Sequence, residues 1–90
     1  MKIRHDTLNK KFYFDEEGKK GHIKYNSNDA DILDLQSTFI DEDIRGQGYG
    51  KELVKYVLEY ARENNFKVIP TCRMVSTYIK RNKEYNSLVV

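Results

Sequence analysis

The stretch from residue 30 to residue 69 changes its hydrophobic period twice, and this constrains the fold more than any other feature. Residues 30–40 alternate as a strand, residues 48–64 carry apolar side chains at helical spacing, and residues 66–69 form a short apolar run stopped by Pro70. A strand–helix–strand unit implies a right-handed crossover and a parallel strand pair. The apolar stripe of the expected helix consists of Leu53, Val54, Val57, Leu58 and Ala61, and Asn64-Asn65 is expected to cap its end.

The rest of the chain adds antiparallel strands before this unit and a helix after it. Residues 12–14 and 21–25 predict a hairpin around the polar turn 15–18, residues 26–29 predict a loop, and residues 73–82 predict a second helix. Phe39 and Ile40 place apolar side chains on both faces of the long strand, which predicts a strand covered on both sides. We therefore expect one α/β (α+β) domain over residues 1–90, with a mixed, mostly antiparallel sheet and a strand–helix–strand–helix C-terminal half.

Charge and composition narrow the classes of partner. Residues 1–24 carry a net charge of +3, residues 25–44 carry six acids and no base, and residues 45–90 carry nine bases and four acids. The basic second half favours an anionic ligand, whereas the acidic middle argues against nucleic acid. One cysteine and two scattered histidines predict neither a disulfide framework nor a metal site. No apolar run approaches the roughly 18 residues of a membrane span, and the first residues lack a signal-peptide core, which predicts a cytoplasmic protein without membrane partners.

The segment from Arg45 to Lys51 carries the clearest functional signal. It reads Arg-Gly-Gln-Gly-Tyr-Gly-Lys and lies between the long strand and the main helix. Glycines allow a tight bend, and the unpaired N–H groups at a helix start favour a phosphate. A Walker P-loop is excluded, because Gly46 and Gly50 are one residue too close and Glu52 replaces the Ser or Thr. A dinucleotide-binding fingerprint is excluded because Lys51 stands at its third glycine.

This segment resembles the acyl-CoA signature [RQ]-x-x-G-x-[GA] of the GNAT acetyltransferase superfamily. The resemblance covers about residues 20–88, and the C-terminal part is similar to the smallest stand-alone members at Pro70, Cys72, Val75, Tyr78, Ile79, Arg81, Glu84 and Tyr85. It implies a GNAT-like fold that binds acetyl-CoA or coenzyme A. The implied pyrophosphate site is formed by Arg45, Gly46, Gln47, Gly48, Tyr49 and Gly50, with Lys51 adding charge. The implied pantetheine and acetyl site is the strand edge at Thr38, Phe39 and Ile40.

The resemblance implies an N-acetyltransferase that acts on a small-molecule or peptide amine. Tyr78 falls where many GNAT enzymes place a tyrosine that protonates the departing thiolate, although its spacing also fits a packed helix face. Cys72 is a candidate nucleophile, proton donor or lining residue beside the expected helix start. Small relatives usually have His at the position of Ser37, so the general base is unassigned. The alternative is a non-catalytic module that binds CoA or a phosphorylated ligand, and either form is expected as a monomer or homodimer.

Overall fold

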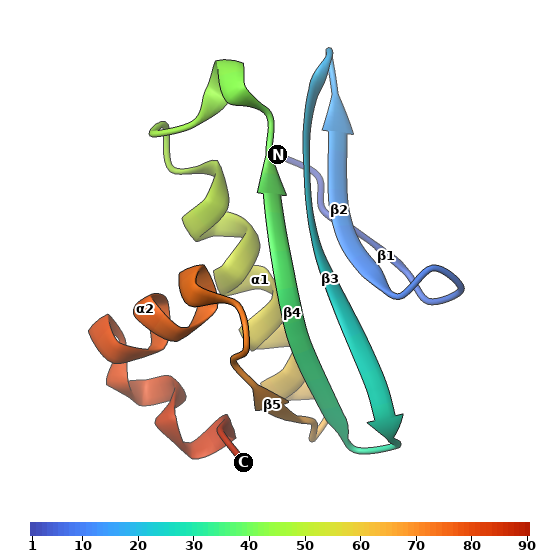
Figure 1. Ribbon diagram of the computed structural model, residues 1–90, viewed down its shortest axis with the longest axis vertical. Coiled ribbons are helices and arrows are strands. Elements are labelled where there is room, and N and C mark those ends of the chain that lie inside the picture. The colour runs from blue at the N-terminus through green and yellow to red at the C-terminus, as the bar shows by residue number, and fades with distance from the viewer.

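The computed structural model describes all residues from 1 to 90 and contains one five-stranded sheet with strand order β1-β2-β3-β4-β5 (Figure 1). The first four strands are antiparallel, and β5 runs parallel to β4. The predicted mixed, mostly antiparallel sheet is therefore confirmed. The strands are β1 (Arg4–Asp6), β2 (Lys11–Glu16), β3 (Lys19–Asp29), β4 (Ile32–Ile40) and β5 (Lys67–Ile69).

Two α-helices and two short 3₁₀ segments complete the fold: η1 (Glu42–Ile44), α1 (Tyr49–Glu63), α2 (Arg73–Arg81) and η2 (Lys83–Leu88). All five residues of the predicted apolar stripe on α1 are fully buried. Helix α1 ends at Glu63, and Asn65, two residues further on, adopts a positive φ of 59°. Phe66 N–H donates to the Ala61 carbonyl (2.8 Å) and Asn65 N–H to the Arg62 carbonyl (3.4 Å), which is the Schellman arrangement. The predicted helix and its asparagine cap are both confirmed. None of the helices is long and apolar enough to cross a membrane.

The helices cover only one face of the sheet. Helix α1 packs across β2, β3, β4 and β5, while α2 and η2 pack against α1 (Figure 1). A single hydrophobic core joins these layers. No helix covers the opposite face of β2–β4, and the Phe39 side chain on that face is 42% exposed. The prediction that the long strand is covered on both sides is therefore wrong.

A β-bulge in β4 decides which of the two apolar residues faces the core. Lys24 pairs with Ser37 but Tyr25 pairs with Leu35, so Gln36 is the extra residue on β4. The extra residue reverses the alternation of side chains along the strand. Ile40 is consequently buried on the same face as Leu35, although strict alternation predicts opposite faces.

Two further boundaries differ from those expected from the sequence. Residues 26–29 belong to β3, because Asn26 pairs with Asp34 and Asp29 with Ile32, and this pairing outweighs the weak strand propensity of Asn and Asp. Strand β1 has three residues, too few to show a period. Its His5 stacks on Phe12 with the ring centres 4.0 Å apart, which holds the strand against the core.

Candidate functional site

The glycine turn between η1 and α1 depends on two left-handed residues. Gly46 has a φ of +80° and Gly48, which is the N-cap of α1, has a φ of +89°. A β-carbon at either position would meet no atom within 4 Å. Glycine is therefore required at both positions because of the positive φ, which other residues adopt only with strain. Together they turn the chain from the end of β4 into the first turn of α1.

The turn leaves a run of backbone N–H groups without acceptors. No N–H from Gly46 to Lys51 donates to another atom of the protein, and the first backbone N–H bonded into the helix is that of Glu52, to the Gly48 carbonyl (3.1 Å). The start of a 15-residue helix also carries a partial positive charge. The Arg45 and Lys51 side chains are exposed beside it. Six unpaired donors and two cations form an arrangement suited to an anion such as a phosphate.

The Arg45 side chain connects this turn to the end of β4. Its Nε donates a hydrogen bond of 2.9 Å to the Ile40 carbonyl. The Gln47 side chain folds back in the same way and donates to the Asp43 carbonyl (3.3 Å). Arg45 therefore holds the turn in place in addition to contributing charge.

The edge of β4 next to the turn has no strand partner. Strand β5 pairs with β4 only from Ile32 to Asp34. Asp41 N–H donates to the Lys20 carbonyl (2.9 Å), and hydrogen-bonded pairs alternate along an antiparallel ladder. The backbone groups of Ile40 and Thr38 therefore point away from β3, toward this open edge, in agreement with the bond from Arg45 to Ile40.

The start of α2 contacts the same edge. Cys72 is the N-cap of α2, and its N–H donates to the Leu35 carbonyl (2.8 Å). Its Sγ lies 3.1 Å from the Thr38 hydroxyl oxygen. The structure thus brings together two predicted site residues that are 34 positions apart in sequence. Phe39, in contrast, points to the opposite face of the sheet, where its ring lies 5.4 Å from that of His22.

The third glycine of the motif has a different function from the first two. Gly50 lies in the first turn of α1, where a β-carbon would come within 2.9 Å of the Met74 sulfur. Gly50 therefore allows Met74 of α2 to pack closely against α1. No sequence signal pointed to Met74, because the contact depends on how the two helices pack.

Tyr49 and Tyr78, two tyrosines predicted in the site, lie in packed surroundings. The Tyr49 ring stacks on Phe14 at 5.6 Å, which fixes the start of α1 against β2. The Tyr78 ring lies 5.9 Å from that of Tyr85, and no hydrogen bond joins its hydroxyl to Cys72. Burial raises the pKa of Tyr78, and the nearby carboxylates of Glu84 and Glu59 raise it further. The Tyr78 hydroxyl is consequently a weaker proton donor than an ordinary tyrosine.

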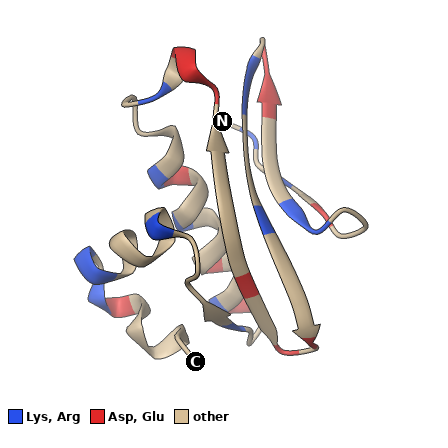
Figure 2. Ribbon diagram, viewed as in Figure 1, with Lys and Arg blue, Asp and Glu red and all other residues tan.

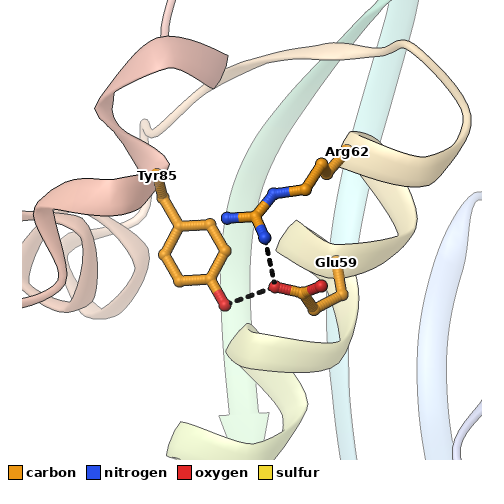
Figure 3. A network of polar contacts seen from close by, with 3 residues as sticks. All are labelled: Glu59, Arg62 and Tyr85. Atoms are coloured by element: carbon orange, nitrogen blue, oxygen red, sulfur yellow. Dashed lines mark hydrogen bonds and ion pairs between the residues drawn. The ribbon is translucent and has the colours of Figure 1, made fainter.

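Figure 3 shows a polar network between α1 and η2 that includes Tyr85. The Tyr85 hydroxyl donates a 2.6 Å hydrogen bond to Glu59, and Arg62 forms a 3.3 Å ion pair with the same oxygen. The Arg62 guanidinium also lies over the Tyr85 ring, 4.8 Å from its centre. These contacts join η2 to α1, and we interpret them as structural.

A surface cavity of about 420 Å³ lies on the β2–β3 side of the turn. Its lining includes Gln47, Gly48 and Tyr49 but none of Thr38, Ile40 or Cys72. Three carboxylates, those of Glu16, Glu17 and Glu52, also line it together with one cation, Lys19. The lining is therefore net negative and would repel a phosphate, so this cavity is a poorer anion site than the unpaired N–H groups.

Comparisons with known proteins agree with this geometry. Protein NATD1 of Mus musculus and of Homo sapiens are each 29% identical over 84 residues, which cover 91% of this chain and 76% and 74% of those proteins. The solution NMR structure of a GCN5-like protein from Staphylococcus aureus is 31% identical, with a TM-score of 0.74, over 99% of this chain and 87% of that one. The family model described as GCN5-related N-acetyl-transferase matches residues 11–88. The matched residues include the glycine turn, the open edge of β4 and the start of α1, and the chain belongs to the GCN5-related N-acetyltransferase family.

Proposed function

We propose that this protein binds acetyl-CoA and transfers its acetyl group to an amine. The observation that carries the proposal is the run of six unpaired N–H groups from Gly46 to Lys51, at the start of α1 and beside the open edge of β4. Such a run suits a pyrophosphate, which offers several acceptor oxygens and two negative charges. The family to which the chain belongs supports the choice of acetyl-CoA among anionic ligands.

Each part of the site has an assigned role in this proposal. The N–H groups of Gly46, Gln47 and Gly48, with those of the first turn of α1, hold the pyrophosphate, and Lys51 neutralises part of its charge. The free backbone groups of Thr38 hold the pantetheine arm, and the free Ile40 N–H polarises the thioester carbonyl. When bound, acetyl-CoA supplies the activated acetyl group.

Cys72 is the side chain that we assign to the reacting end of the site. It lies 3.1 Å from Thr38, on the edge where the thioester is expected. It would act either as the proton donor to the departing thiolate or as a nucleophile that carries the acetyl group. Tyr78 is the second candidate proton donor, although burial raises the pKa of its hydroxyl above that of an ordinary tyrosine.

A thermal-shift titration with acetyl-CoA tests the binding step. A ligand that binds only the folded state raises stability as RT ln(1 + [L]/Kd). The double variant Arg45→Glu and Lys51→Glu should lose the shift, while the matched control Lys55→Glu, an exposed lysine one turn further along α1, should keep it. At an acetyl-CoA concentration about 100 times a micromolar Kd, the expected stabilisation is about 2.7 kcal/mol, and no thermal shift at that concentration would reject acetyl-CoA as the ligand.

The alternative is a module that binds CoA without catalysis, and one observation favours it. Neither histidine is near Cys72: His5 is in β1, at the far edge of the sheet, where it stacks on Phe12, and His22 is on the opposite face of the sheet. No imidazole is therefore available as a general base at the proposed reacting end. A transfer assay over small amines, polyamines and peptides, corrected for thioester hydrolysis, separates the two: a thermal shift without transfer supports the binding module.

Mass spectrometry after incubation with acetyl-CoA defines the role of Cys72. An added acetyl group on Cys72 that disappears when an amine is supplied supports the nucleophile. Transfer that is slowed in Cys72→Ala without any acetylated intermediate in the native protein supports the proton donor. Full transfer activity in Cys72→Ala would reject both roles.

A further inference from the structure

The sheet face that no helix covers carries a row of planar side chains. Arg4 pairs with Tyr13, Tyr13 with His22, and His22 with Phe39, so the four residues lie side by side across β1, β2, β3 and β4. The sequence neighbours of the row, such as Phe12 and Ile23, are fully buried beneath α1, and because side chains alternate along a strand the row lies on the opposite face. We call this surface the open face. Neighbouring strands are about 4.8 Å apart, so the row spans about 14 Å.

Lysines flank the row along the same face. Lys11 pairs with Lys24, two positions along β2 and β3 from Tyr13 and His22. The Lys11 ammonium lies 5.3 Å from the centre of the Tyr13 ring. Partial burial lowers the pKa of His22, and the charges of Lys24 and Lys11 lower it further. The two lysines therefore produce a positive potential at the row itself.

Most carboxylates near this surface lie at its margins or are already engaged. Asp6 accepts hydrogen bonds from Asn9, Asp34 accepts one from Thr71, and Asp41 accepts one from the Lys20 N–H, while Asp15 lies opposite Lys20 in the strand register. Figure 2 shows no acidic residue along the middle of β3: the acidic residues lie at strand ends and turns, on η1, in the lower half of β4, and on α1 and η2. The acidic segment of residues 25–44 argues against nucleic acid in the sequence, but the fold places five of its six carboxylates at or beyond the ends of β3 and β4, with Asp41 two positions after Phe39.

We propose that the open face binds single-stranded nucleic acid. Exposed aromatic and guanidinium planes on neighbouring strands stack bases, and flanking lysines contact phosphates. An acidic peptide would use the lysines but leave the rings without a partner. The proposal is independent of acetyl-CoA, because the row uses the opposite face from Thr38 and Cys72.

Fluorescence anisotropy with a labelled 12-nucleotide oligouridylate tests the proposal. We expect Tyr13→Ala and Phe39→Ala each to weaken binding about fivefold or more, since one base–ring stack is lost. Tyr56→Ala, which removes a ring 41% exposed on α1, is the matched control and should leave binding unchanged. Lys24→Gln should reduce the slope of log K against log salt by about 0.7, while Lys55→Gln should not. Circular dichroism and thermal unfolding verify that each variant is folded.

NMR titration of the histidine imidazoles gives a second readout that does not depend on variants. Phosphates near Lys24 should raise the pKa of His22 when the oligonucleotide binds, whereas the pKa of His5 should not change. Equal affinity for heparin, which has no bases, or for poly-glutamate would overturn the proposal. So would equal affinity for double-stranded RNA, the absence of binding at low salt, or ring variants that bind as the native protein does.

Discussion

Gly48 should not tolerate a β-carbon, and the reason is conformational rather than steric. Its φ is +89°, and an added β-carbon would meet no atom within 4 Å. For an L-residue other than glycine this left-handed region costs about 1–2 kcal/mol. Gly48→Ala should therefore lower the free energy of unfolding by about that amount. In a domain of this size 1 kcal/mol corresponds to about 4–8 °C in Tm, so the Tm should fall by about 4–16 °C.

A matched substitution separates strain from crowding. Asparagine has a larger side chain than alanine but adopts the left-handed region more readily. Gly48→Asn should therefore be more stable than Gly48→Ala if strain is the cause, and less stable if crowding is. Urea unfolding of the three proteins at pH 7 measures the difference directly.

The acetyl-CoA response of the same variants tests the proposed site. If Gly48→Ala keeps the native turn, it is destabilised but its thermal shift with acetyl-CoA persists. If the turn relaxes to remove the strain, stability recovers, but the unpaired N–H groups are no longer aligned and the shift is lost. A variant that retains both native stability and the full shift would refute the reasoning about Gly48.

Two further predictions concern stability. Tyr85→Phe removes the hydrogen bond to Glu59, whose side chain is 34% exposed, so a water molecule can replace the hydroxyl. The free energy of unfolding, measured with urea, should therefore fall by only about 1 kcal/mol. An unchanged free energy would show that the network does not stabilise the fold. Burial lowers the pKa of both His5 and His22 below the ordinary 6.5. As the pH falls below about 6.5, these histidines therefore take up protons in the unfolded chain before they do in the folded protein, and the free energy of unfolding should fall. His5→Phe should flatten that pH dependence in part, and an unchanged profile would contradict the role of His5.

Local patterns in the sequence were enough to predict the elements near the candidate site. The apolar stripe of α1, its asparagine cap and the glycine turn each depend on residues within a few positions of one another. The unpaired N–H groups follow from the same local geometry, because every helix start leaves its first donors without acceptors. The position of the candidate anion site could therefore be predicted from the sequence.

Contacts between distant residues decided the remainder. The bulge at Gln36 depends on how β3 and β4 pair, and it reversed the expected faces of Phe39 and Ile40. The approach of Cys72 to Thr38 joins two elements 34 residues apart, and the function of Gly50 became clear only from its contact with Met74.

By itself the sequence determined the order of the main strands and helices after β1, the main helix and the turn that presents a row of backbone donors. These properties are local, because backbone conformation and helical or strand periodicity are set by neighbouring residues. Only the tertiary structure decided which face of the sheet is covered, which side chains meet at the open edge of β4, and where the acidic segment places its charge. Those properties depend on strand register, and a shift of one residue moves every following side chain to the other face.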